Sequence, residues 1–178
     1  MSKRLTFILG GVRAGKSSYA QRLAEDGRRV LFVATAEAGD AEMEARIRTH
    51  QENRPAEWDT LEEPLDLVEA LMPVLDRYDT VLLDCLTLWV SNLLLSNQGR
   101  DIPAEARRLL EVCRRSEAAW VVVSNEVGLG VVPANELGRA FADELGRVNQ
   151  LVAAEADVVF FMAAGLPLTV KEPADRQC

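Results

Sequence analysis

Short apolar runs alternate with longer amphipathic stretches along the whole chain. Runs of aliphatic and aromatic residues that end in a glycine, an acid or a small polar residue are typical of buried strands. The pattern predicts strands at residues 5–9, 30–34, 81–84, 120–124 and 158–162, with 168–171 as a candidate for a sixth. Several buried strands separated by other elements indicate a parallel sheet.

The stretches between these runs carry apolar residues at helical spacing, and glycine and proline mark many of their ends. The predicted helices are residues 17–25, 41–53, 64–75, 86–95, 103–115 and 135–156. Strands that alternate with helices predict an α/β protein whose sheet is covered on both faces. No internal repeat or linker is evident, so we expect a single domain over residues 1–178.

Composition narrows the class of protein. The chain has 178 residues, of which 48% are hydrophobic and 27% charged, and its net charge is −8. An acidic surface argues against nucleic-acid binding, but a few local cations could still hold small anionic ligands. No signal peptide or membrane span is evident, and three scattered cysteines fit a reducing compartment. We therefore expect a cytoplasmic protein without a nucleic-acid partner or a membrane span.

The segment Gly10-Gly11-Val12-Arg13-Ala14-Gly15-Lys16-Ser17 matches the P-loop pattern G-x-x-x-x-G-K-[ST]. It lies where this motif functions, between a predicted strand and a predicted helix. In such a loop the backbone N–H groups surround phosphates, the lysine reaches the β- and γ-phosphates, and the hydroxyl binds Mg²⁺. A chance match is the alternative, expected in under about 1% of chains of this length. The motif predicts a nucleotide-dependent phosphotransferase with Lys16 as a catalytic residue and Ser17 as a metal ligand.

A second metal ligand is predicted at Asp84, where an apolar strand ends in an acid. Ligands of open α/β sheets bind at the carboxyl ends of the strands, which places this carboxylate beside the P-loop. A surface acid or a cap of the following helix is the alternative. Asn125 and Glu126, at the end of another predicted strand, are a competing polar pair at the same edge of the sheet.

The single histidine, His50, lies on a predicted helix. Helical spacing puts it on one face with Arg46, Asn53 and Arg54. Two guanidinium groups beside an imidazole could hold a polyphosphate while a ring nitrogen attacks phosphorus. A solvated histidine on a charged helix is the alternative, and spacing alone favours it.

Four blocks of the sequence resemble the bifunctional adenosylcobinamide kinase / adenosylcobinamide-phosphate guanylyltransferase family of cobalamin biosynthesis. They are the P-loop; residues 34–36 with 40–47, His50, Arg54, Pro55, Trp58, Thr60 and Glu62; residues 83–87 with 92–94; and residues 124–133 with 146–150 and 164–167. The second and fourth blocks are far more specific than the P-loop. One departure is Ala14, where a serine is common, and a small residue suits a loop that acts through its backbone.

The resemblance implies two reactions. A kinase moves the γ-phosphate of ATP or GTP to the aminopropanol hydroxyl of adenosylcobinamide, and a guanylyltransferase moves GMP from GTP, through a histidine, to adenosylcobinamide phosphate. His50 matches the guanylylated histidine. The P-loop and the resemblance together predict the nucleotide-binding residues, which are Gly10, Gly11, Val12, Arg13, Ala14, Gly15, Lys16, Ser17, Ala34, Thr35, Ala36, Arg46, Gln51, Glu52, Asn53, Arg54, Glu62 and Asp84. A homotrimer, Mg²⁺ as cofactor and a three-layer P-loop NTPase (RecA-like) fold with a mostly parallel central sheet are also implied.

Two other readings of the sequence remain open. A small P-loop metabolite kinase without guanylyltransferase activity shares the P-loop but gives His50 no function. A GTP-dependent switch or a RecA-like ATPase module is the alternative outside metabolism. A Ras-like switch would normally carry the guanine-reading tetrapeptide Asn-Lys-x-Asp, which is absent here.

Overall fold

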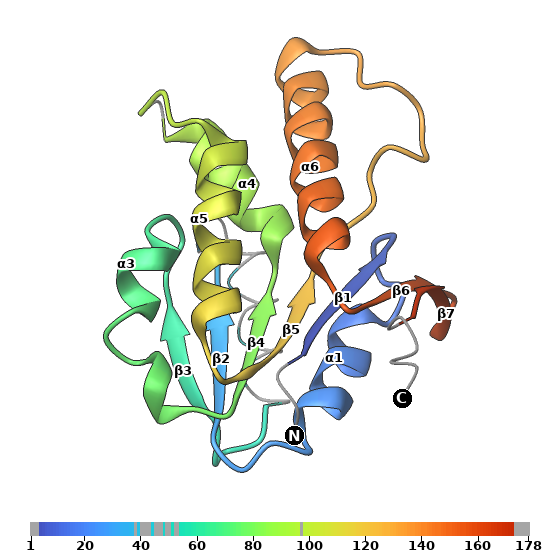
Figure 1. Cartoon of the computed structure of the whole chain (residues 1–178). Helices are drawn as coiled ribbons and strands as arrows, with labels where there is room; N and C mark the ends of the chain where they lie inside the picture. The colour runs from blue at the N-terminus through green and yellow to red at the C-terminus, as the bar shows by residue number, and fades with distance from the viewer. Residues whose placement is uncertain are drawn as a thin grey trace.

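The computed structural model describes residues 4–37, 39, 44, 48, 51, 54–96 and 98–172 (Figure 1). Its strands are β1 (Leu5–Gly10), β2 (Val30–Ala34), β3 (Asp59–Glu62), β4 (Thr80–Asp84), β5 (Ala119–Val123), β6 (Val158–Ala163) and β7 (Leu166–Lys171). Its helices are α1 (Lys16–Ala24), α3 (Leu67–Leu71), α4 (Leu86–Leu95), α5 (Ile102–Arg115) and α6 (Glu136–Glu155), with a short 3₁₀ helix, η1 (Leu75–Arg77).

All seven strands form one sheet in the order β3-β2-β4-β5-β1-β6-β7. Every neighbouring pair is parallel except β6 and β7, which are antiparallel. The strand that leads into the P-loop, β1, lies between β5 and β6, and the strand that ends in Asp84, β4, is the neighbour of β5 on the other side. The two predicted phosphate-handling segments therefore leave the same edge of the sheet.

Successive strand residues face opposite sides of the sheet, and each side has its own helices. Phe7 and Leu83 belong to the larger hydrophobic cluster, which α3, α4, α5 and α6 cover. Ile8 and Leu82 belong to a second cluster, which α1 covers through Ala20 and other residues. This alternation follows from the two-residue period of a strand. The three-layer α/β arrangement predicted from the sequence is confirmed.

Two differences from the predicted elements concern residues 59–77. The short strand β3 was not predicted, because Asp-Thr-Leu-Glu lacks an apolar run, and as an edge strand β3 buries little. The helix predicted over residues 64–75 was too long, since the structure has only α3 and then η1. The helix predicted over residues 41–53 and the segment after Pro173 lie almost entirely outside the described residues. No helix among the described residues is long and apolar enough to cross a membrane.

Candidate active site

The P-loop connects the end of β1 to the start of α1, as predicted. Gly10 has a φ of 153° and Gly15 a φ of 91°, a region of backbone conformation that side chains with a Cβ rarely adopt. A Cβ on Gly10 would lie 2.6 Å from the carbonyl oxygen of Met162, and one on Gly15 would lie 3.1 Å from the Cα of Gly165. At both positions a larger residue would therefore collide with neighbouring backbone, which belongs to β6 for Gly10 and to the turn after β6 for Gly15.

Lys16 is the first residue of α1 and is 8% exposed. Its Nζ atom donates a hydrogen bond of 2.6 Å to the carbonyl oxygen of Gly11, so the ammonium group turns back into the loop. Burial lowers the pKa of Lys16, and its electrostatic interactions with Cys85 and Asp84 oppose that shift. A buried cation of this kind suits a site that receives a polyphosphate.

The N-terminus of α1 offers further binding capacity for an anion. Its N-cap residue is Gly15, which has no side chain to satisfy the first N–H groups, and its first turn contains no acid. The free N–H groups and the positive end of the helix dipole therefore face the loop without local compensation. Ser17, in this first turn, is partly exposed, and its hydroxyl is available to a ligand beside Lys16.

Asp84 ends β4 and pairs in register with Ala34 of β2 and Val123 of β5. Its charge acts on Lys16 and also on Arg54, because it counteracts the fall in pKa that burial causes in both. Asp84 thus lies between the P-loop and the segment that contains Arg54. Hydroxyl and carboxylate oxygens suit Mg²⁺, and Ser17 and Asp84 supply one of each.

Thr35 joins the ends of β2 and β4. Its hydroxyl donates to the carbonyl oxygen of Cys85 at 2.7 Å and accepts from the N–H of Cys85 at 3.1 Å. The side-chain amide of Asn92 in α4 then donates to the carbonyl oxygens of Thr35, at 2.8 Å, and of Pro64, at 3.1 Å. These bonds fix the backbone that directly follows Asp84 and hold Thr35 at the carboxyl edge of the sheet.

Arg54 lies over β2 and next to β3. Its guanidinium carbon is 3.6 Å from the centre of the Phe32 ring, and its Nη1 donates to the hydroxyl of Thr60 at 2.6 Å. Its Nε is buried and has no partner among the described residues. Burial lowers the pKa of Arg54, while the charges of Glu62 and then Asp84 oppose the shift. This partly buried cation is a second candidate contact for a phosphate.

Gln51 and Glu62 are connected near Arg54. The side-chain amide of Gln51 donates to Oε1 of Glu62 at 3.0 Å. Both were predicted as nucleotide-binding residues, and both are found with Arg54 at the end of β3. The other predicted residues of this segment, Arg46, His50, Glu52 and Asn53, lie outside the described residues, so the shared helical face predicted for them stays a prediction.

The competing pair, Asn125 and Glu126, lies directly against the P-loop. The N–H of Glu126 donates to the carbonyl oxygen of Gly10 at 3.1 Å. The N–H of Asn125 donates to the hydroxyl of Thr87 at 2.7 Å, and its carbonyl oxygen accepts from the side-chain amide of Asn149 at 3.0 Å. Two buried residues, Thr87 of α4 and Asn149 of α6, thus fix this backbone, and no pattern in the sequence predicted this role for them.

The turn between β6 and β7 supports the P-loop from the other side. Ala164 and Gly165 both have positive φ values, 50° and 84°, as a tight two-residue hairpin turn requires. The N–H of Gly165 donates to the carbonyl oxygen of Ala14 at 3.1 Å. Residues 164–167 were noted in the sequence only as part of the family resemblance, and this contact gives them a structural role.

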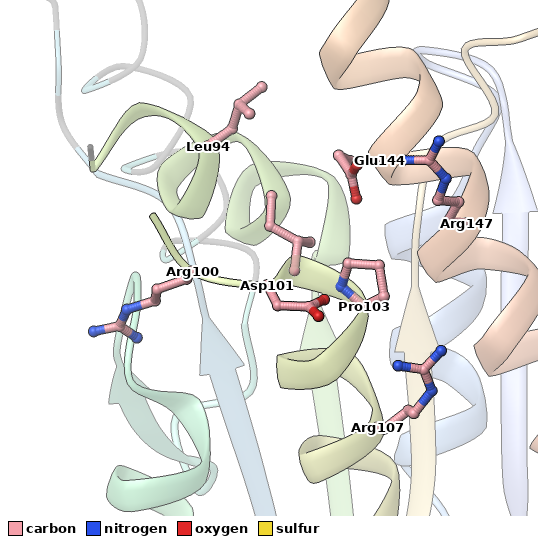
Figure 2. Close-up of a pocket in the computed structure, with 8 residues that line it drawn as sticks. Leu94, Arg100, Asp101, Pro103, Arg107, Glu144 and Arg147 are labelled. Atoms are coloured by element: carbon pink, nitrogen blue, oxygen red, sulfur yellow. Dashed lines mark hydrogen bonds and ion pairs between the residues drawn. The ribbon is translucent and has the colours of Figure 1, made fainter. Parts of the chain in front are cut away.

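One surface pocket lies away from this edge, between α4, α5 and α6, as Figure 2 shows. It has a volume of about 500 Å³ and contains no predicted site residue. Of its three arginines, Arg100 pairs with Asp66 at 2.7 Å and Arg147 pairs with Glu144. These ion pairs reduce the positive charge that the pocket offers to an anionic ligand.

This chain is similar to known proteins over nearly its whole length. A family model described as cobinamide kinase / cobinamide phosphate guanyltransferase matches residues 6–170. The bifunctional adenosylcobalamin biosynthesis protein CobP of Pseudomonas aeruginosa is 47% identical, over 92% of this chain and 95% of its own. The bifunctional adenosylcobalamin biosynthesis proteins CobU of Salmonella typhimurium and Escherichia coli are 39% and 38% identical, each over 94% of this chain and 99% of its own.

A solved structure shows the same fold at much lower identity. The flagellar accessory protein FlaH of Methanocaldococcus jannaschii superposes with a TM-score of 0.60 at 12% identity, over 97% of this chain and 80% of that one. The expected three-layer P-loop fold with a mostly parallel central sheet is confirmed by the sheet itself and by this superposition. Because the family model and three relatives match nearly the whole chain, this protein belongs to the cobinamide kinase / cobinamide phosphate guanyltransferase family.

Proposed function

We propose that this chain carries out two successive transfers of cobalamin nucleotide-loop assembly. In the first, it phosphorylates the aminopropanol hydroxyl of adenosylcobinamide with ATP or GTP. In the second, it transfers GMP from GTP to the adenosylcobinamide phosphate, which gives adenosylcobinamide-GDP. The observation that carries the proposal is the family match over residues 6–170, which includes a P-loop with a buried lysine.

In the kinase reaction, the P-loop holds the triphosphate. The N–H groups of the loop and of the α1 N-terminus bind its oxygens, and Lys16 exchanges its bond to Gly11 for bonds to the β- and γ-phosphates. Ser17 and Asp84 hold Mg²⁺, which supplies charge neutralisation on the phosphates when bound. The described residues contain no group of three or more acids, histidines or cysteines that could hold a metal, which fits an ion bound largely through its nucleotide.

In the guanylyl transfer, His50 is the nucleophile. A neutral ring nitrogen attacks the α-phosphorus, a nitrogen–phosphorus bond forms, and the bond to the β-phosphate oxygen breaks so that pyrophosphate leaves. A phosphate oxygen of the corrinoid then attacks the same phosphorus and displaces the imidazole. Arg54 binds the phosphates and Glu62 orients the nucleotide, and we assign the same nucleotide-binding role to Ala34, Thr35, Ala36, Arg46, Gln51, Glu52 and Asn53.

The remaining properties are proposals of the same kind. We place both reactions in one domain and in the cytoplasm, where the nucleotide substrates are found. Cys85 and Cys113 are free thiols, which fits a reducing compartment. The homotrimer is expected from the family resemblance, and light scattering on the purified chain would measure it.

The test separates the two reactions at His50. The chain is incubated with Mg²⁺ and [α-³²P]GTP, and a phosphorus–nitrogen bond is recognised by its loss in acid. His50→Ala should lose the covalent label and the formation of adenosylcobinamide-GDP, whereas phosphorylation of adenosylcobinamide should survive, because that step needs only the P-loop, the metal and the acceptor. His50→Gln is a second variant that preserves side-chain polarity.

Each contrary result has a definite meaning. A label that persists in both variants would show that another residue is the nucleophile. Loss of the two activities together would show that His50 positions a shared nucleotide. A wild-type chain that phosphorylates a metabolite but never acquires the label would favour the alternative, a P-loop metabolite kinase without guanylyltransferase activity.

A further inference from the structure

The loop between β5 and α6 exposes an unusual amount of apolar surface. Residues 127–134 contain no charged side chain, although 27% of the whole chain is charged. Leu129, Val131 and Val132 are 79%, 94% and 75% exposed. Contiguous apolar side chains on a protein surface mark a place where a partner or a ligand is bound. This loop is therefore a candidate contact surface for an uncharged, apolar part of another molecule.

The loop is fixed at both ends, so its apolar side chains are held outward. At its start, the N–H of Glu126 is bonded to the first glycine of the P-loop, and Val127 packs against the larger hydrophobic cluster. At its end, Arg139 donates to the carbonyl oxygens of Pro133, at 3.1 Å, and Ala134, at 2.8 Å. In Figure 1 the loop arches away from the sheet between these two attachments. The exposure is thus a feature of the fold.

The position of the loop points to the acceptor substrate. The loop follows Glu126, whose N–H is bonded to Gly10, so its start lies beside the P-loop that is proposed to hold the triphosphate. Val12, in the P-loop itself, is also 73% exposed and adds apolar surface there. The acceptor must place its hydroxyl at this point while its corrin ring, which carries methyl groups and neutral amides, lies further out. A charge-free aliphatic loop complements such a ring and would repel no part of it.

We propose that residues 127–134 form the surface that holds the corrin ring of adenosylcobinamide during both transfers. The inference rests on the proposed function and names the part of the site that binds the acceptor. Leu129, Val131 and Val132 cover the methyl-bearing rim of the ring, and the carbonyl and N–H groups between them are within reach of its amides. A second copy of this chain is the competing occupant of the same surface.

The experiment uses the full chain with Val131 and Val132 both changed to aspartate. Met72→Asp is the matched control, because Met72 is an apolar residue, 66% exposed, at the C-terminal end of α3, which lies at the opposite end of the sheet from the loop (Figure 1). Five quantities are measured: binding of adenosylcobinamide by calorimetry, the KM for adenosylcobinamide and the KM for GTP in the kinase assay, corrinoid-free labelling by [α-³²P]GTP, and the molar mass by light scattering.

The double variant should weaken corrinoid binding and raise the KM for adenosylcobinamide at least about tenfold, since it puts two charges where the bound ring would cover apolar side chains. The KM for GTP, the corrinoid-free label and the mass should stay unchanged, and Met72→Asp should match the wild type throughout. An unchanged corrinoid affinity overturns the proposal, and so does a change of mass, which would make the loop a subunit contact. If the wild type binds adenosylcobinamide but does not phosphorylate it, and the double variant weakens that binding, the corrinoid surface is supported and only the kinase assignment is contradicted.

Discussion

A single carboxylate at the end of β4 connects the two candidate phosphate contacts. Asp84 counteracts the desolvation of Lys16 on one side and of Arg54 on the other. Lys16 is buried and Arg54 is partly buried, and the nearby carboxylate favours the charged form of each. The arrangement therefore places a triphosphate at Lys16 and a second phosphate-binding side chain at Arg54 on one continuous edge of the sheet.

Lys16→Ala should abolish phosphoryl transfer, with kcat reduced about 100-fold or more, while the fold is retained. The side chain contributes one hydrogen bond, to Gly11, and its removal also relieves the cost of burying a charge. The measurement is the kinase rate together with the melting temperature. Lys171→Ala is a matched control, because Lys171 binds the carbonyl oxygens of Ala153 and Ala154 at the end of α6. Normal turnover in a folded Lys16→Ala chain would contradict the P-loop assignment.

Asp84→Asn should shift the Mg²⁺ dependence of the kinase to higher concentrations, by about tenfold, and excess Mg²⁺ should partly restore the rate. An amide binds the ion more weakly than a carboxylate does. Glu126→Gln is the matched control from the neighbouring strand, since an amide oxygen can still accept the bond from Gly128. The prediction is checked by Mg²⁺ titrations of the three proteins. If Glu126→Gln shifts the titration and Asp84→Asn does not, the metal-binding acid has been assigned to the wrong strand.

At the scale of elements, the P-loop is enclosed by its neighbours on both sides. The start of the β5–α6 loop is bonded to Gly10, and the β6–β7 turn is bonded to Ala14. Arg13, between them, has a φ of 57°, a strained value for a residue other than glycine. Contacts from two other elements thus hold a backbone that local preference would not favour.

Gly10→Ala and Gly11→Ala should therefore behave differently, although they are adjacent and chemically identical changes. A Cβ on Gly10 meets the backbone oxygen of Met162, whereas one on Gly11 meets no atom within 4 Å. Gly10→Ala should lower the free energy of unfolding by about 1–3 kcal/mol and weaken nucleotide binding. Gly11→Ala should stay near the wild type in stability. Urea unfolding and nucleotide titrations check both, and equal losses of stability would contradict the steric argument.

The elements with continuous apolar cores could be predicted from the sequence, and the short or polar ones could not. The strand ending in Asp84 has neighbours on both sides and is buried, so its hydrophobicity identifies it. Strand β3 pairs with β2 alone, and its residues need not be apolar. The start of α3 is set by the Glu63 carboxylate, which accepts bonds from the N–H groups of Leu65 and Asp66, both at 2.9 Å, and so forms a turn where a helix was predicted.

The site divides in the same way. The P-loop is a local motif, and Asp84 follows from the rule that parallel strands end at one edge, so both could be predicted. The contacts that fix them were not, because they join residues far apart in the chain, as Asn149 with Asn125 and Gly165 with Ala14 do. The role of His50 depended on the family resemblance, since a lone histidine on a charged helix has no distinctive spacing.

On the scale of the whole molecule, two cysteines contact different hydrophobic clusters. Cys113 of α5 belongs to the larger cluster, and Cys85 packs against the smaller one. Burial raises the pKa of Cys85 to about 11, and it raises the pKa of Cys113 as well. Both thiols therefore stay protonated at neutral pH, and neither competes with a histidine as a nucleophile in the guanylyl transfer.

These thiols should make the folded state lose stability in alkaline solution. In the unfolded chain a thiol ionises near pH 8.5. In the folded protein both thiols stay protonated at higher pH, and the pKa of Cys85 is about 11. Between these values the unfolded state binds fewer protons than the folded state. The free energy of unfolding therefore has its maximal value below about pH 8 and falls by about 1 kcal/mol per pH unit for each thiol as the pH rises. Urea unfolding of the wild type and of Cys113→Ala between pH 7 and pH 10 measures this. Cys113→Ala will be less stable at pH 7 because it leaves a cavity, but its stability should fall less steeply with pH. Parallel curves for the two proteins would show that the Cys113 thiol does not contribute to the alkaline loss.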